Sequence, residues 1–222
     1  MKGNAVLYAE MTPPPNDEAA FNTWYDTHHA PSHVQGVPGF LAGRRYKHPT
    51  GPGYLAVYEL TTPETLKTED YRSRKYTPDP PTKAMLSRVT GFARYIAVET
   101  GVHKRPEVGD GWIDAQICHP AFFTVPAERR AAFDAWYVDD LIPTVLRCKE
   151  WLCVRRLRVV ENDPHPFTDM VLHYCADMSV EAAPERKASI DSPVRAALAK
   201  EPWFKVYASF FVRRPLTFVK GR

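Results

Sequence analysis

Hydrophobic and polar residues alternate in blocks along this chain, and turns rich in proline and glycine separate the blocks. Short alternating or continuous apolar segments predict strands, whereas apolar residues spaced three and four positions apart predict helices. In the first half the pattern predicts strands at residues 5–10, 40–46, 54–60 and 92–99. It predicts helices at residues 18–34, 62–71 and 82–89. The first half therefore has the order β-α-β-β-α-β.

The second half has the same order. Strands are expected at residues 112–119, 151–160, 169–176 and 203–213, and helices at residues 127–148 and 180–200. Residues 101–111 contain Pro106, Gly109 and Gly111 and few apolar side chains, so they predict a linker. We expect a first repeat at residues 1–100 and a second repeat at residues 112–222.

A repeated motif supports this division. The frame Phe-x-x-Trp-Tyr…Pro begins at Phe21 and recurs, 112 positions later, at Phe133. Further identities at this spacing extend from Thr12 to Tyr95. Inside the frame, His28-His29 of the first copy are replaced by Asp140-Leu141 in the second. The shared residues predict a duplicated scaffold, and the difference favours a functional site in the first copy.

The β-α-β-β-α-β order is that of a ferredoxin-like unit, which forms a four-stranded antiparallel sheet with helices on one face. The other face stays apolar and must be covered. Two such sheets that pack face to face cover each other and enclose a space. The sequence thus predicts an α+β protein with a ligand cavity between two sheets.

The segment Trp24-Tyr25-Asp26-x-x-His29-x-Pro31, followed by Val37-Pro38-Gly39-Phe40 and Arg44-Arg45-Tyr46, resembles the EthD-like branch of the dimeric α/β-barrel superfamily. The second copy keeps Trp136, Tyr137, Pro143 and Arg156 but lacks the histidine, so it is similar to a degenerate family unit. The resemblance implies an intramolecular dimeric α/β barrel made from two tandem ferredoxin-like repeats. The superfamily includes cofactor-free monooxygenases, polyketide cyclases, muconolactone isomerases and heme enzymes such as chlorite dismutases, so the fold does not select a reaction.

Three residues of this segment are the catalytic candidates. His29 occupies the family's His-x-Pro position, and an imidazole suits proton transfer near neutral pH. Asp26, three residues earlier, is expected to orient it as a second group orients a general base. Tyr25 offers a hydroxyl to the same pocket. The alternatives are that His29 only packs at a kink before Pro31, or that it contacts a metal or heme.

Four further residues are candidates for substrate binding: His28, Arg44, Tyr58 and Tyr95. His28 points away from His29 on an ideal helix, which also fits an exposed histidine. Arg44 shares a strand face with Phe40, Ala42 and Tyr46, where it holds a substrate oxygen or forms an ion pair. Core packing is the alternative for Tyr58 and Tyr95, as it is the preferred interpretation of Trp24.

Other histidines are weaker candidates. His33 follows His29 at a ligand-like spacing of four, but Pro31 lies between them and no cysteine or carboxylate completes a set of ligands. We therefore expect no metal. His119 and His173 lie on second-copy strands, and either can face the cavity.

The composition of the chain indicates which binding partners to expect. The 222 residues carry a net charge of only +3, from 29 basic and 26 acidic residues, and contain no long basic run, so nucleic acid is not an expected partner. No segment approaches the ~20 apolar residues that span a bilayer, and we expect no signal peptide. The expected location is cytoplasmic, either as a monomer with an internal pseudo-dimer or as a homodimer.

Together these features predict a cofactor-independent lyase, cyclase or isomerase. His29 would transfer a proton to or from a small aromatic or polyketide-like substrate in the barrel cavity. Two alternatives remain open at this point: a heme-binding enzyme of the same superfamily, and a non-catalytic protein that only binds a small molecule.

Overall fold

A computed structural model describes residues 1–221. The chain divides into two compact units, and each is considered separately below. Unit 1 comprises Met1–Val98, Val160–His165 and the C-terminal residues from Phe211, and unit 2 comprises Glu99–Val159 and Pro166–Phe210. The units therefore exchange short segments instead of following the two halves of the sequence. In particular, residues 101–104, which were expected to be linker, continue a strand.

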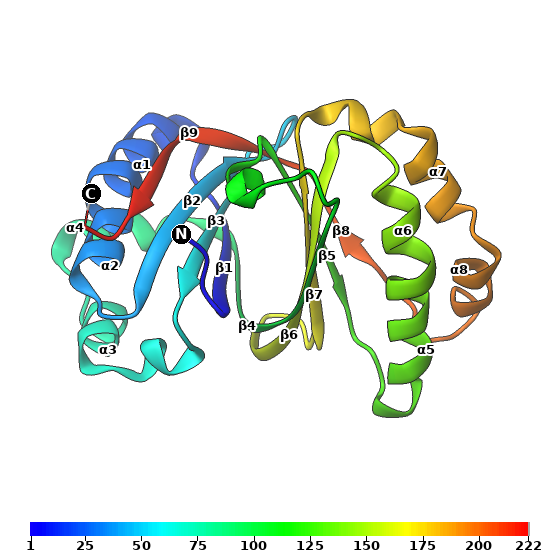
Figure 1. Cartoon of the computed structure of the whole chain (residues 1–222). Helices are drawn as coiled ribbons and strands as arrows, with labels where there is room; N and C mark the ends of the chain where they lie inside the picture. The colour runs from blue at the N-terminus through cyan, green and yellow to red at the C-terminus, as the bar shows by residue number, and fades with distance from the viewer. Residues whose placement is uncertain (222) are drawn as a thin grey trace. The chain divides into compact units, whose positions relative to one another are not determined.

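Unit 1 is an antiparallel sheet in the order β4-β1-β3-β2-β9. Its strands are β1 (Ala5–Thr12), β2 (Phe40–Lys47), β3 (Tyr54–Leu60), β4 (Thr90–Lys104) and β9 (Phe211–Val219). The first four strands have the ferredoxin-like order. β9, coloured red in Figure 1, comes from the end of the chain and lies beside β2.

Helices cover one face of this sheet (Figure 1). They are α1 (Glu18–Trp24), α2 (Ala30–Gly36), α3 (Glu69–Tyr76) and α4 (Pro80–Leu86), with short 3₁₀ turns at Pro15–Asp17 and Pro63–Lys67. A π-helical turn, Tyr25–His29, joins α1 to α2 without a break. Its wider loop closes on the Tyr25 carbonyl, to which Ala30 donates its N–H. Such a turn accommodates Pro31, which would otherwise clash with the preceding turn of an α-helix.

Unit 2 repeats this plan with strand order β6-β7-β5-β8. Its strands are β5 (Ile117–Phe123), β6 (Trp151–Asp163), β7 (Asp169–Cys175) and β8 (Tyr207–Ala208), and its helices are α5 (Arg130–Ala135), α6 (Ile142–Val145), α7 (Pro184–Ile190) and α8 (Pro193–Leu198). Short 3₁₀ turns occupy Asp110–Asp114, Ala127–Arg129 and Met178–Ala182. A second π-helical turn, Trp136–Leu141, precedes Pro143. The proline of the repeated frame therefore accompanies the same helix distortion in both copies.

Two second-half strands differ from the expectation. The strand expected at residues 112–119 begins only at Ile117, because Trp112 lies in the 3₁₀ turn and packs its ring 4.9 Å from that of Tyr174. The strand expected at residues 203–213 is reduced to β8, and the chain resumes as β9 in unit 1. Hydrophobicity alone cannot show which sheet a terminal strand joins.

A β-bulge changes which residues of β2 share a face. The register of β2 against β3 shifts between Phe40 and Ala42, and an equivalent shift occurs between Trp151 and Cys153 of β6. Phe40 therefore lies on the helix-covered face, whereas Ala42 and Arg44 lie on the opposite one. The expectation that Phe40 and Arg44 share a face was wrong, because the bulge inserts one residue between them.

The same registers show which strand residues of the two copies correspond. Tyr58 on β3 and His173 on β7 hold matching positions, since they lie opposite Leu7 and His119 respectively. Gly43 lies opposite Tyr58, and Val154 lies opposite His173. A Cβ atom on Gly43 would come within 2.9 Å of the Tyr58 ring. Gly43 therefore leaves room for the tyrosine, whereas the smaller imidazole of His173 tolerates valine.

We predict that Gly43→Val destabilises the protein by about 1–3 kcal/mol, because the added side chain overpacks the site against the Tyr58 ring. In a Tyr58→His background, which carries the pair found in unit 2, the same substitution should cost less than about 1 kcal/mol. Urea unfolding of the four proteins of this cycle measures the difference. An equal cost in both backgrounds would show that the ring does not require the glycine.

Candidate functional site

Unit 1 contains a pocket of about 120 Å³ between the helix-covered face of its sheet and its helices. Strand residues form one wall, the π-helical turn and α2 form another, and α3 and α4 complete it. The chemically active residues among those that line it are Tyr25, His29, His33, Tyr58, Tyr71, Arg74, Lys75 and Arg94. This "first pocket" lies within one unit.

Two histidines meet in the first pocket. The rings of His29 and His33 have centroids 4.6 Å apart, and His29 also lies 4.5 Å from Trp24 and 4.8 Å from Tyr25. His33 donates its Nδ1–H to the His29 backbone carbonyl at 2.8 Å, which leaves Nε2 with the lone pair. Burial lowers the pKa of His33, and burial together with the neighbouring His33 lowers that of His29 well below its usual value. Both imidazoles are therefore neutral at pH 7.

Hydroxyls and cations surround this pair. Tyr58 donates a hydrogen bond to the Tyr25 hydroxyl at 3.0 Å, and burial raises the pKa of both phenols. Arg94 donates to the Tyr71 hydroxyl at 3.2 Å and also pairs with Glu161. No aspartate or glutamate lines the pocket within the described chain. The site thus combines neutral bases, hydroxyl donors and positive charge, which suits an oxyanion.

The structure brings together three of the seven candidates that the sequence singled out: Tyr25, His29 and Tyr58. Asp26 lies elsewhere, since its carboxylate binds Arg45 and, at 3.0 Å, Arg214. The carboxylate therefore neutralises arginines, and within the described chain it forms no hydrogen bond with His29. Arg44 and Tyr95 lie on the opposite face of the sheet, where Tyr95 contacts the ring of Tyr8 at 6.0 Å.

His28 serves a structural contact. Its Nε2 lies 2.9 Å from Asp79, which caps α4, and its side chain is 45% exposed. In unit 2, Asp140 replaces His28 and accepts a 2.5 Å hydrogen bond from Ser192, which caps α8. Both copies thus connect the same helices with different side chains. This half of the His28-His29 difference is explained by packing, so of these two histidines only His29 lines the first pocket.

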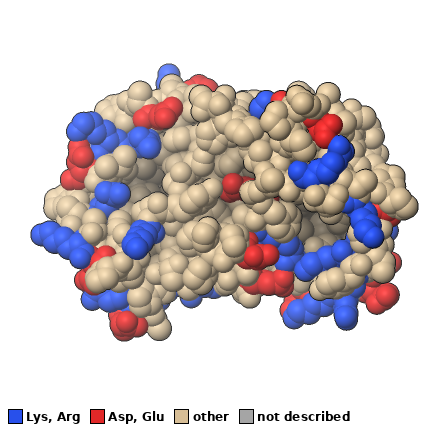
Figure 2. All heavy atoms as spheres, turned by 180° about the vertical axis from the view of Figure 1, so that it is seen from behind, with Lys and Arg blue, Asp and Glu red and all other residues tan. Residues whose placement is uncertain are grey.

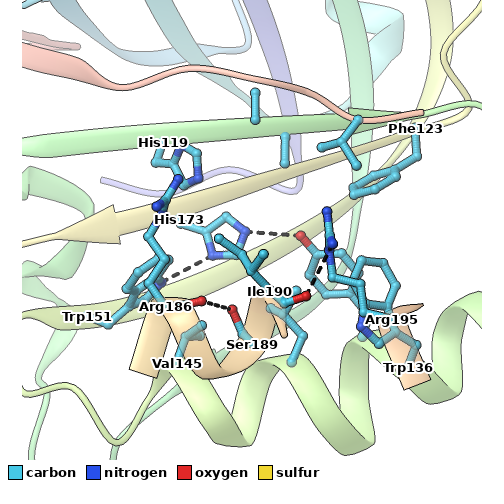
Figure 3. Close-up of a pocket in the computed structure, with 15 residues that line it drawn as sticks. His119, Phe123, Trp136, Val145, Trp151, His173, Arg186, Ser189, Ile190 and Arg195 are labelled. Carbon is cyan, nitrogen blue, oxygen red and sulfur yellow. Dashed lines mark hydrogen bonds between the residues drawn. The ribbon is translucent and has the colours of Figure 1, made fainter. Parts of the chain in front are cut away.

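Unit 2 holds a matching pocket of about 250 Å³, the "second pocket" (Figure 3). It lies between the strands that carry His119 and His173 and the helices that carry Arg186, Ser189 and Arg195. His173 accepts a hydrogen bond at Nδ1 from the Trp151 indole at 3.1 Å, and its Nε2 lies 3.0 Å from the Tyr137 hydroxyl. Tyr137 matches Tyr25, so the hydroxyl at the π-helical turn meets the middle strand in both units.

The histidines have changed elements between the copies. In unit 1 the helix supplies His29 and His33, whereas the strands supply Leu7 and Tyr58. In unit 2 the helix supplies Leu141 and Val145 at the same positions of the repeat, and the strands supply two histidines. The second repeat, expected to be degenerate, therefore retains a built pocket with an imidazole pair.

Sequence reasoning gave little weight to several pocket residues. His33 was considered only as a metal ligand, although its spacing of four from His29 places both rings on one side of the helix. Tyr71, Arg74 and Arg94 carried no motif that distinguishes them from surface residues. Within the described chain no group of three or more potential metal ligands occurs, and no helix is long and apolar enough to cross a membrane. Basic and acidic side chains are interspersed on the face in Figure 2.

Comparison with solved structures shows the fold. An anthrone oxidase-like protein superimposes with a TM-score of 0.68 at 12% identity, covering 99% of this chain and 94% of that one. A putative monooxygenase from Lactobacillus acidophilus has a TM-score of 0.57 at 10% identity, with 98% and 97% covered. A chlorite dismutase from Candidatus Nitrospira defluvii has a TM-score of 0.58 at 8% identity, with 97% and 93% covered.

This chain therefore has the α+β fold of the dimeric α/β-barrel proteins, and the fold class expected from the sequence is confirmed. Identities this low show the fold and not the activity. No protein-family model matches the chain, and no curated protein resembles it in sequence. The likenesses do not single out the EthD-like branch.

The pockets predict how stability depends on pH. Burial lowers the pKa of His29, His33, His119 (to about 4) and His173, so the unfolded chain binds more protons than the folded one below about pH 6.5. The free energy of unfolding should therefore fall as pH decreases through 6.5, by up to about 1.4 kcal/mol per pH unit for each histidine. Urea unfolding between about pH 7.5 and about pH 5 measures this slope, because this range brackets the ordinary imidazole pKa of about 6.5.

The second copy provides the matched control. A variant with His29→Leu and His33→Val carries the residues that unit 2 has at these positions, and it should show a shallower slope. An unchanged slope would contradict titration of this pair.

The Asp26 network makes a separate prediction. Asp26→Asn should destabilise the protein by about 3 kcal/mol, because Arg45, with a side chain only 2% exposed, loses its buried counter-charge. Asp134→Asn removes the carboxylate from the matching Arg156, but that aspartate is 38% exposed, so the cost should stay below about 1 kcal/mol. Equal unfolding free energies for both variants would rule out a special role for the buried pair.

Proposed function

We propose that the first pocket is the active centre of a cofactor-independent enzyme that removes a proton from a small aromatic or polyketide-like substrate. The observation that supports this most directly is the His29–His33 pair, in which a backbone hydrogen bond orients one imidazole toward use as a base. The resemblance of residues 24–46 to the EthD-like branch and the fold shared with small-molecule enzymes are consistent with it.

The roles follow from the contacts. The histidine pair supplies the base, and within it the fixed tautomer favours His33, whose Nε2 carries the lone pair. Lowered pKa values keep both imidazoles unprotonated but make them weak bases, so the substrate must have an acidic proton, such as a C–H beside a carbonyl or phenol. Tyr58 donates to the Tyr25 hydroxyl, Tyr25 donates its own proton to the substrate oxygen, and Arg94 stabilises the enolate charge.

The same first step serves several reactions. If the enolate regains a proton at another carbon, the reaction is an isomerisation. If it expels a leaving group, the reaction is that of a lyase, and if it attacks a second carbonyl, a ring closes. The neighbours described as an oxidase and a monooxygenase suggest reaction of the carbanion with dioxygen instead. Our proposal is the proton removal, and dioxygen uptake separates the later steps.

A heme is not part of the proposal. The two pockets have volumes of about 120 and 250 Å³. Sites for drug-sized ligands typically have volumes of about 300–1,000 Å³, and a porphyrin is at least as large as such a ligand. His173 uses both ring nitrogens in hydrogen bonds, so it has no lone pair left for iron.

The test is exchange of an acidic C–H for deuterium in D2O, with 2-tetralone as probe and ¹H NMR as the measurement. His33→Gln should slow the catalysed exchange by about 10²–10⁴, and His29→Gln by at least about tenfold. His103→Gln, which lies outside both pockets, should leave the rate unchanged. Wild-type exchange in both pocket variants would exclude the pair as the base.

Two further readouts separate the alternatives. Because the pKa of the base is lowered, the rate should hold steady down to about pH 6.5 and fall only below it, as the imidazoles become protonated. A wild-type protein that binds the probe but catalyses no exchange would instead support a non-catalytic binding protein. Dioxygen consumption coupled to exchange would identify an oxidase.

A further inference from the structure

The second pocket contains more hydrogen-bond donors than its own residues can satisfy. We propose that it is a separate binding site for a single-ring aromatic carboxylate. The argument rests on the direction of one hydrogen-bond chain, on an indole with no acceptor, and on two arginines without carboxylate partners. None of these involves the first pocket, so the inference is independent of the proposed reaction.

The hydrogen-bond chain has only one possible direction. An indole nitrogen can only donate, so Trp151 donates to Nδ1 of His173. Neutral His173 must then carry its proton on Nε2, from which it donates to the Tyr137 hydroxyl. That hydroxyl therefore keeps its own proton for another acceptor, and the described chain provides none. Figure 3 shows Trp151 linked to His173 at the wall of the pocket.

A second donor also lacks a partner. Trp136 lines the pocket with a side chain that is 2% exposed, and its Nε1–H has no acceptor in the part of the chain that the structure describes. In unit 1 the matching Trp24 donates to Thr82 at 3.3 Å. Counted from the capping residues Asp79 and Ser192, the corresponding position in unit 2 is Arg195, whose guanidinium cannot accept a hydrogen bond. A buried donor without a partner is unfavourable, and an oxygen of a ligand would relieve it.

Positive charge completes the recognition of an anion. Arg186 and Arg195 line the pocket, and each guanidinium donates to one backbone carbonyl, of Glu181 and Ile190 respectively. Neither pairs with a carboxylate within the described residues, and none of the residues that line the pocket is acidic. In the first pocket, by contrast, Arg94 is already paired with Glu161. Planar guanidinium groups bind a carboxylate in two-point fashion.

The side chains that form the walls of the second pocket favour an aromatic ring attached to the carboxylate. Phe123, Trp136 and Trp151 provide flat apolar surfaces, and the volume of about 250 Å³ is below that of a typical drug-sized site, so one aromatic ring fits. His119 donates its Nδ1–H to the Ser209 carbonyl, and its Nε2 is left to accept a hydrogen bond from a ring hydroxyl. Benzoate and 4-hydroxybenzoate are the simplest ligands of this class.

The test is isothermal titration of the full chain with benzoate, supported by quenching of tryptophan fluorescence. We expect one benzoate per chain, with benzyl alcohol and inorganic phosphate each binding at least about tenfold more weakly. Arg195→Gln and Arg186→Gln should each lower the benzoate affinity about tenfold or more, and Tyr137→Phe several-fold. Circular dichroism confirms that each variant is folded.

Arg74→Gln is the control, since Arg74 lines the first pocket and not the second. It should leave the affinity unchanged. Loss of binding in Arg74→Gln with retention in Arg186→Gln would overturn the proposal, as would phosphate that binds as tightly as benzoate. His33→Gln should slow C–H exchange without affecting benzoate binding, so failure of one proposal is distinguishable from failure of the other.

Discussion

Both units depend on one buried tyrosine held at a π-helical turn. In each, the phenol ring lies near an arginine from the bulged strand, with Arg45 4.0 Å from the centre of the Tyr25 ring and Arg156 5.9 Å from that of Tyr137. Each hydroxyl then bonds to the middle strand of the sheet, at Tyr58 or His173. The proline that follows favours the widened turn, and the bulge turns the arginine toward the helix. Packing of helix on sheet and the placement of both pockets follow from these contacts.

This shared frame explains how one architecture supports two different sites. The helix and the strands face the same space, so an imidazole can be supplied from either side. Unit 1 uses the helix and pairs its histidines with tyrosine hydroxyls and Arg94. Unit 2 uses the strands, and its histidine fixes the direction of the Tyr137 hydroxyl. Duplication preserved the scaffold while the polar groups of the two pockets diverged.

Much of the fold could be predicted because it depends on local periodicity. The order of elements and the duplicated frame followed from apolar spacing and from prolines that act within one turn. The beginning of β5 was misplaced because Trp112 is apolar yet lies in a 3₁₀ turn. At the spacing of 112 positions Arg44 corresponds to Arg156, and this correspondence was wrong for another reason. Equivalent bulges make Arg45 the counterpart of Arg156, and a bulge cannot be recognised from alternation.

The sequence by itself determined that the chain is a tandem repeat of ferredoxin-like units and that His29 lies where the copies differ, because both facts rest on residue order and spacing. Only the tertiary structure decided which side chains meet. It paired Asp26 with Arg45 and Arg214, and it brought His33 beside His29. It also gathered His119 and His173 opposite α7 and α8. These contacts join residues from separate elements, and their geometry depends on bulges, π-helical turns and strand register, which no linear pattern records.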